Sequence, residues 1–304
     1  MKRYASIDIG SNTILLLIGE VNANGTLDML CDIGETTRLG RGLSKGKLLH
    51  PESVHASIVT LKKFVSLCDK EGVEEIAVVG TNALRLARDA DQFIKRVRNE
   101  CGIVLRVINE REEGLFTNLS VQRDPSMPHD AIVIDVGGGS TEYIFNDRGD
   151  NSSTDEIVSL LLGAVSLTEK IVRHDPPTRH ELVKLRREID DALKHILVAG
   201  NRTMVGIGGT AATIAAINLG LNKFDRKMIH GHQLTIDEIK TLVKKLQMLD
   251  IESKQKVPGL SPDRADIIMA GAMIILASME KIGSPLIYIS CCGLRYGLLY
   301  RMAM

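Results

Sequence analysis

The chain has 304 residues, and 38 lysines and arginines balance 38 aspartates and glutamates. An apolar fraction of 44% with 25% charged residues is typical of a globular protein and excludes disorder as the main state. Zero net charge, no tryptophan and few other aromatic residues argue against a nucleic-acid or membrane-surface binder held by bulk charge. The length predicts about two domains.

The cysteines and the apolar runs indicate the compartment. Five cysteines without a C-x-x-C pair predict reduced thiols and a cytoplasmic protein. Asp8 interrupts the first apolar stretch, so we expect no signal peptide. The longest apolar run, 267–279, is too short to span a bilayer and predicts a buried helix.

The first part of the chain reads as a sheet with helices. Apolar alternation and turn residues predict strands over 3–9, 13–21, 27–34, 76–79 and 103–108. Apolar residues at helical spacing predict helices over about 54–68, 82–99 and 110–122. The turn-forming stretch 123–128 is the best domain boundary, which gives domains of 1–123 and 124–304.

The second part repeats this order. We expect strands over 131–135, 143–145, 156–162, 203–207 and 286–290. Helices are expected over 165–174, 179–198, from 210, 236–247, 262–281 and 294–303, and the last one could pack back on the first domain. Residues 6–13 and 134–141 share an apolar strand that ends in Asp, a glycine turn and a second strand. The repeat predicts a duplicated α/β domain with a central cleft.

The two glycine turns suit phosphate groups. Glycines let backbone amides converge into an anion-binding nest, and hydroxyl and amide side chains add donors. An Asp at the end of the preceding strand can hold hydrated Mg²⁺, which prefers one or two carboxylates with water and phosphate oxygens. The predicted phosphate-binding residues are Gly10, Ser11, Asn12, Thr13, Gly137, Gly138, Gly139, Ser140 and Thr141, with Asp8 and Asp135 as metal ligands. The alternative is that both turns are plain hairpins.

Two further segments place a glycine between a strand and a helix. Gly80 to Arg85 could present amides and a guanidinium to an anion, although Arg85 could equally be a solvated helix residue. Gly208, Gly209 and Thr210 could bind a phosphate or approach a nucleoside, or could serve only close packing between strand and helix.

Carboxylates are the candidates for chemistry. Glu110, Glu112 and Glu113 open a helix, where the helix dipole favours negative charge, and we interpret Glu110 and Glu112 as helix-start residues. Glu142 follows the second turn directly. Hydrolysis of a phosphoanhydride needs a carboxylate to orient or deprotonate water. His230 and His232 lack the further ligands of a zinc site, which favours a loop role.

An ordered series of motifs resembles the exopolyphosphatase/guanosine pentaphosphate phosphohydrolase (Ppx/GppA) family. The series runs along nearly the whole chain and consists of residues 8–12, 80–85, 112–114, 134–142, 163–169, 208–210, 230–232, 258–266 and 293–295. The resemblance implies two domains of the actin/hexokinase/Hsp70 fold, which is ribonuclease H-like, and Mg²⁺- or other divalent-cation-dependent removal of a terminal phosphate.

The resemblance also implies roles for single residues. Glu113 resembles the general base for the attacking water, and Asp135 and Glu142 resemble metal-binding and water-orienting carboxylates. Arg85 and the two turns would grip phosphates. The sequence departs from the family at Asn109-Glu110, Gly114, Ser166 and Tyr296, and it lacks the extra helical C-terminal region of longer members.

Three function classes remain open. The leading one is an exopolyphosphatase that releases orthophosphate from inorganic polyphosphate, with guanosine pentaphosphate as a further substrate. The alternatives are a catalytically silent sensor of polyphosphate or of guanosine penta- and tetraphosphate, and a small-molecule kinase of the same fold. We expect no nucleic-acid or membrane partner, and a homodimer.

Overall fold

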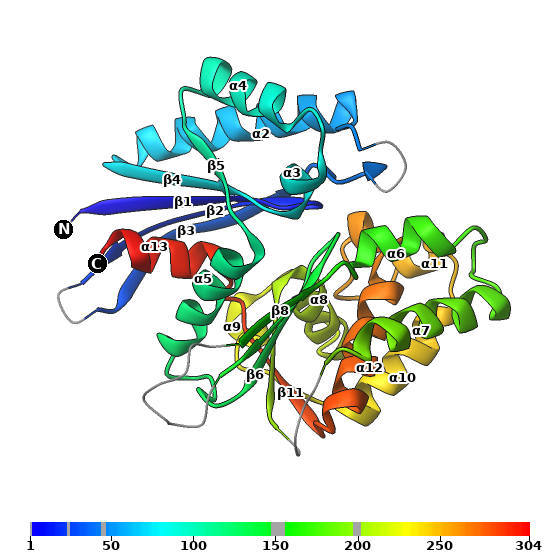
Figure 1. The fold of residues 1–304 in the computed structure, drawn as a ribbon. Helices are drawn as coiled ribbons and strands as arrows, with labels where there is room; N and C mark the ends of the chain where they lie inside the picture. Colours follow the sequence, from blue (N-terminus) through cyan, green and yellow to red (C-terminus); the bar gives the residue numbers. More distant parts are fainter. Residues whose placement is uncertain (1, 23–24, 44–46, 147–155, 197–201) are drawn as a thin grey trace. The chain divides into compact units, whose positions relative to one another are not determined.

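A computed structural model (Figure 1) describes residues 2–22, 25–43, 47–146, 156–196 and 202–304. The chain forms two compact units, Met1–Ser120 with Cys292–Met304, and Val121–Cys291. The sequence placed the boundary after residue 123; in the structure the chain leaves the first unit after Ser120 and returns to it after Cys291, so that the last helix belongs to the first unit.

The first unit is built on a five-stranded sheet in the order β3-β2-β1-β4-β5. β1, β2 and β3 are antiparallel, whereas β4 and β5 run parallel to β1. Its elements are β1 (Arg3–Ile9), β2 (Thr13–Val21), β3 (Leu27–Thr36), α2 (Pro51–Lys70), β4 (Glu75–Gly80), α3 (Asn82–Leu86), α4 (Ala90–Cys101), β5 (Leu105–Val107), α5 (Glu110–Gln122) and α13 (Leu294–Met302).

Helices cover both faces of this sheet (Figure 1). α2 begins with Pro51, which suits a first helical position, and packs Ile58, Leu61 and Phe64 into the core on one face. On the other face α13 packs Tyr296 and Leu299 against the sheet. This apolar face explains why α13 belongs to the first unit.

The second unit is built on a six-stranded sheet in the order β10-β11-β9-β6-β7-β8. β6, β7 and β8 are antiparallel, β9 and β11 run parallel to β6, and β10 is antiparallel to β11. Its strands are β6 (Ile132–Val136), β7 (Thr141–Phe145), β8 (Glu156–Leu160), β9 (Met204–Ile207), β10 (Gln233–Thr235) and β11 (Leu286–Ile289).

The helices of the second unit surround one apolar segment. The helices are α6 (Ala164–Ile171), α7 (Arg179–Leu193), α8 (Gly208–Asn218), α9 (Arg226–Ile229), α10 (Ile236–Gln247), α11 (Ile251–Gln255) and α12 (Ile268–Ile282). α12 is buried on nearly all sides, as its unbroken apolar run predicted. α7 and α10 each begin with a Thr/Glu capping box.

The structure corrects several expected boundaries. The single helix expected over 82–99 is two helices, because the amide of Arg88 donates to Lys47 O and Asp89 Oδ1 accepts from the amide of Leu49. The helix expected from 262 starts at Ile268 after a 3₁₀ turn over Pro262–Arg264. α7 ends at Leu193, and the end expected at 198 lies outside the described residues.

The short elements α9, β10 and α11 were not predicted from the sequence. None of the helices in the described residues combines the length and the apolarity that a bilayer crossing requires. None of the five cysteines forms a disulfide.

Candidate functional site

The tip between β1 and β2 is a tight turn that leaves backbone donors uncommitted. The amide of Gly10 donates to Thr13 O at 3.1 Å. The amides of Ser11 and Asn12 make no hydrogen bond within the described chain, although both residues are buried. Two neighbouring amides of this kind form a nest that can receive an anion.

A following segment holds this tip in place. The amides of Thr37 and Arg38 both donate to Asn12 O, at 3.0 and 2.9 Å, and the amide of Gly40 donates to Ser11 O at 2.7 Å. A Cβ at Gly40 would lie 2.7 Å from Ser11 Cβ, so only glycine permits this approach. The carbonyls of Ser11 and Asn12 are therefore occupied while the amides of these two residues are not.

Arg85 and Glu113 meet within the first unit. Arg85 lies on α3, at the end of β4, and its Nη1 donates to Glu113 Oε2 at 2.7 Å and to Ile108 O at 3.0 Å. Its Nε lies 3.0 Å from Glu110 Oε1. Neither Nε nor Nη2 makes a hydrogen bond in the described part of the molecule.

The three glutamates at the start of α5 have different surroundings. Asn109 and Glu112 form reciprocal backbone–side-chain bonds of 2.9 and 3.2 Å, which cap the helix, and Glu112 also pairs with Arg106. The side chain of Glu110 is 49% exposed, whereas that of Glu113 is 13% exposed. Burial raises the pKa of Glu113, Arg85 opposes the rise, and the Glu110 charge adds to it. Glu113 combines a low exposure with a raised pKa, which suits a proton acceptor.

The second tip also presents unbonded amides. Gly137 N donates to Ser140 O at 3.0 Å, as Gly10 does to Thr13 in the first tip. The amides of Gly138, Gly139 and Ser140 make no hydrogen bond with any described residue. Three neighbouring amides beside a buried serine again form a nest for an anion.

α6 supports the second tip from behind. The amide of Ala164 donates to Gly137 O, and those of Val165 and Ser166 donate to Gly138 O, at 2.9–3.0 Å. A Cβ at Gly163 would overlap the backbone of Gly138. The amides at the start of α6 are therefore used for support and do not face an anion.

Thr141 and Thr210 have structural bonds that the sequence did not reveal. Thr141 is fully buried and its Oγ1 donates to Leu162 O at 2.5 Å. Thr210 Oγ1 donates to Val136 O at 3.0 Å. Both hydroxyl protons are committed to backbone carbonyls beside the tip, so these side chains fix its shape.

Asp135 and Glu142 lie directly opposite each other in the β6–β7 pair. Side chains at directly opposed positions lie on one face of the sheet with Cβ atoms about 4.5–5.5 Å apart. Glu142 is buried and its Oε1 accepts from Ser159 Oγ at 2.9 Å. Two carboxylates on one face beside an amide nest are a donor set that fits hydrated Mg²⁺. Asp8, at the matching position of β1, lies opposite Leu15.

Gly208 and Gly209 permit two close approaches. Gly208 has φ +82°, and a Cβ there would lie 2.5 Å from Asp135 Oδ1. A Cβ at Gly209 would overlap the guanidinium of Arg264. Arg264 is not among the site residues predicted from the sequence, although it lies within the motif at 258–266 that contributes to the family resemblance. The start of α8 thus brings together a carboxylate, an arginine and helix amides.

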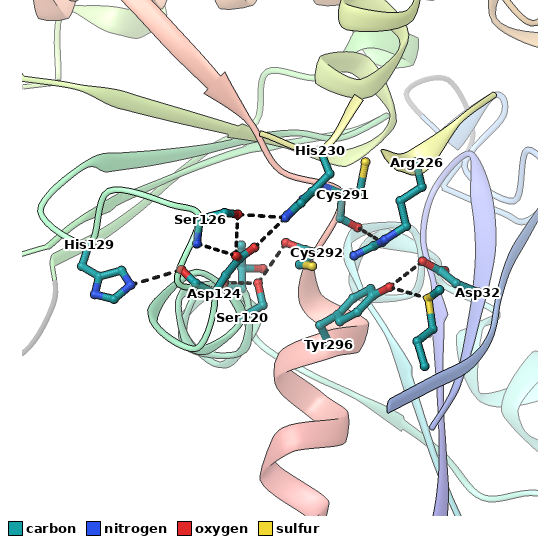
Figure 2. A network of polar contacts seen from close by, with 12 residues as sticks. Asp32, Ser120, Asp124, Ser126, His129, Arg226, His230, Cys291, Cys292 and Tyr296 are labelled. Carbon is teal, nitrogen blue, oxygen red and sulfur yellow. Dashed lines mark hydrogen bonds and ion pairs between the residues drawn. The ribbon is translucent and has the colours of Figure 1, made fainter. Parts of the chain in front are cut away.

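A separate polar cluster surrounds His230 (Figure 2). Its Nδ1 accepts from the amide of Cys291 at 3.2 Å, while Nε2 lies 3.1 Å from Ser126 Oγ and 3.0 Å from Asp124 Oδ2. Ser126 Oγ donates to Asp124 Oδ1 at 2.6 Å. A Ser-His-Asp triad needs the acid and the serine on different ring nitrogens, so this cluster is no triad. His230 ties Asp124 to Cys291, so a carboxylate that the sequence did not place near His230 lies beside it.

The model of the Ppx/GppA phosphatase family matches residues 17–304. The chain belongs to this family. A bifunctional 3-dehydroquinate synthase/phosphatase of Fusobacterium nucleatum is 30% identical over 300 residues, which are 94% of this chain and 44% of that protein. The chain therefore spans less than half of that relative. Exopolyphosphatase 2 of Mycobacterium tuberculosis is 28% identical over 90% of this chain and 89% of its own length.

A solved structure supports the same assignment. The Ppx/GppA family member from Aquifex aeolicus is 32% identical, covers 99% of this chain and 97% of its own, and superimposes with a TM-score of 0.83. These matches confirm the resemblance and the duplicated actin/hexokinase/Hsp70-like α/β fold. The roles of Glu113, Arg85, the tips and the carboxylates remain predictions.

Proposed function

We propose that this Ppx/GppA protein is an exopolyphosphatase that hydrolyses the terminal phosphoanhydride of inorganic polyphosphate. Water attacks the terminal phosphorus, the bond from that phosphorus to the bridging oxygen breaks, and the products are orthophosphate and a chain one phosphate shorter. The observation that carries the proposal is Glu113, a carboxylate with a raised pKa and a side chain only 13% exposed that is held by Arg85.

Each group has a part in this proposal. Glu113 accepts the proton of the attacking water, and Arg85 binds a phosphoryl oxygen. The amides of the two tips bind further phosphate oxygens. Asp135 and Glu142 would hold Mg²⁺, which supplies positive charge that neutralises the phosphate oxygens. Asp8 is a weaker candidate for the metal, because Leu15 lies opposite it.

The test is orthophosphate release from polyphosphate by the purified protein, with Mg²⁺ and after chelation. We expect release that depends on the divalent cation. Binding of polyphosphate without release would favour the sensor alternative. Release only when an acceptor and ATP are present would favour a kinase.

Guanosine pentaphosphate is the second substrate to test, because its 5′ end is the same kind of terminal phosphoanhydride. If the two substrates compete for one site, the constant for inhibition of polyphosphate hydrolysis by guanosine pentaphosphate should equal the KM of guanosine pentaphosphate as a substrate. Light scattering of the same preparation tests the expected homodimer.

A further inference from the structure

Exposed cations gather beside the first tip. Arg41 follows Gly40, whose amide is bonded to the tip, and Arg88 follows α3, which carries Arg85. Lys47 joins these two segments, because its O accepts from the amide of Arg88 at 2.7 Å and its amide donates to Leu43 O at 3.3 Å. Backbone hydrogen bonds thus tie Gly40, next to Arg41, to the tip and Lys47 to Arg88, which follows Arg85 by three residues.

Within the described residues, no ion pair neutralises the three cations. All are exposed, and none takes part in an ion pair or side-chain hydrogen bond within the described residues. The neighbouring acids have other contacts: Asp89 Oδ1 accepts from the amide of Leu49, and Glu52 lies 4.0 Å from His50. Elsewhere in this unit, Lys62, Lys63 and Arg96 are paired with glutamates.

The backbone here has an uncommon conformation. Arg38 (φ 51°) and Lys47 (φ 56°) are the two non-glycine residues with positive φ in the described chain, and both are cations in this segment. Side chains with a Cβ rarely adopt this conformation, and such residues cluster at functional sites. Leu39 and Leu43 are buried in the core of the first unit and anchor this segment there.

We propose that Arg41, Lys47 and Arg88 form a cationic strip that binds the phosphates of a polyphosphate chain beyond its reacting end. This inference rests on the proposed function and names the part of the substrate that the strip recognises. The strip fits a bare polyanion better than a nucleic acid, because residues 37–50 and 82–89 contain no Phe, Tyr or Trp on which a base could stack.

The strip refines what the composition implies. Zero net charge offers no long track for a polyanion, yet net charge does not exclude a local group of cations. Three cations can contact only a few phosphates. The benefit of added chain length is therefore expected to appear early and then level off.

The experiment compares a triple variant, Arg41→Gln/Lys47→Gln/Arg88→Gln, with the wild type on tripolyphosphate and on a chain of tens of phosphates. For the long chain we expect KM to rise about 10-fold and the slope of log KM against log salt to fall by about 2, because each released contact lowers the slope by about 0.7–0.9. For tripolyphosphate we expect a rise below about 3-fold.

A matched control removes three cations of the same unit that lie outside the strip. Lys70, Lys95 and Arg98 are exposed and lie on α2 and α4. The variant Lys70→Gln/Lys95→Gln/Arg98→Gln has the same net charge as the strip variant. It should keep the wild-type KM and salt slope for the long chain.

The outcomes separate this inference from the proposed function. If the wild type hydrolyses tripolyphosphate and the two triple variants have equal KM values for the long chain, the strip is rejected while the function stands. If the wild type hydrolyses neither substrate, the function fails. Equilibrium binding of the long chain to the wild type and both variants then decides the strip: a loss confined to the strip variant supports it, and equal affinities reject it. Tighter binding of single-stranded nucleic acid than of polyphosphate also rejects it.

Discussion

The two tips have the same backbone plan and different side chains. In each unit an Asp is the second-last residue of a strand, a turn leaves amides unbonded, and a neighbouring segment occupies carbonyls of the turn. The first tip is held by an irregular segment and the second by a helix start. The position opposite the Asp differs most, because it is Leu15 in the first unit and Glu142 in the second.

The two units of the duplicated fold present different side chains on a similar scaffold. The strand order β3-β2-β1-β4-β5 matches β8-β7-β6-β9-β11, so five strands of the two sheets correspond, and β10 is an addition in the second unit. The first unit contributes a base candidate, Glu113 with Arg85, and the second contributes the carboxylate pair Asp135 and Glu142. Under the proposed function both units would bind phosphate, whereas the base would lie in the first unit and the metal-binding carboxylates in the second.

The largest expected effect tests Glu113, the base candidate in the first unit. Glu113→Gln should lower kcat by about 10²–10⁴-fold, the usual cost of losing a general base, while polyphosphate affinity changes little. Orthophosphate release and equilibrium binding measure the two quantities. Glu112→Gln is the control on the same helix, because its carboxylate caps α5 and pairs with Arg106. A Glu113→Gln enzyme with near-wild-type kcat would remove Glu113 from the mechanism.

The next effect compares the supports of the two tips. Gly163→Ala should lower the stability of the second unit by about 3 kcal/mol, because the new Cβ overlaps backbone that cannot move freely. Gly40→Ala should cost about 1–2 kcal/mol in the first unit. Gly220→Ala has open space and a φ of +62°, and should cost about 1 kcal/mol. Hydrogen exchange of each unit would report the losses; equal losses at all three positions would contradict the role of close approach.

Asp124 should stabilise the second unit in a pH-dependent way. Burial alone would raise its pKa, but contacts from His230 and Ser126 lower the pKa from 3.8 to about 2. A lowered pKa gives stability that is present above pH 3.8 and is lost as the pH falls through about 2. Asp124→Asn should therefore cost about 2 kcal/mol at pH 7 and much less near pH 2. A cost that is constant from pH 7 to pH 2 in hydrogen exchange would rule out this linkage.

Loss of a proposed metal-binding carboxylate in the second unit should have a smaller effect, because added Mg²⁺ can restore activity. Asp135→Asn should raise the Mg²⁺ concentration needed for half-maximal activity by about 10-fold or more, because one of two carboxylates is lost. Asp8→Asn should raise it less, since the residue opposite Asp8 in the strand pair is Leu15 and not a carboxylate. Equal shifts for the two variants would mean that both tips hold the metal alike.

The sequence predicted the features that depend on local pattern. Alternating strands, the glycine turns and the buried run at 267–279 follow from residue order, and all appear in the structure. The break after Leu86 could not be predicted, because it depends on bonds from Arg88 and Asp89 to residues about 40 positions earlier. The pairing of Arg85 with Glu113 and the approach of Arg264 to Gly209 also depend on long-range packing.

The last prediction concerns the pH profile and separates the charges around Glu113. The carboxylate must be ionised to accept a proton, so kcat should fall as the pH drops through its pKa. Because burial raises that pKa, the acid limb should lie above the ordinary glutamate value of 4.5. Arg85 opposes the rise, so Arg85→Gln should move the limb to still higher pH, while Arg85→Lys keeps the charge and should move it less. Glu110 adds to the rise, so Glu110→Gln should move the limb in the opposite direction. Two variants that shift one limb in opposite directions cannot both act through altered phosphate binding or general instability. If both shift it in the same direction, Glu113 is not the group that titrates, and the base must be sought outside the first unit's Arg85–Glu113 pair.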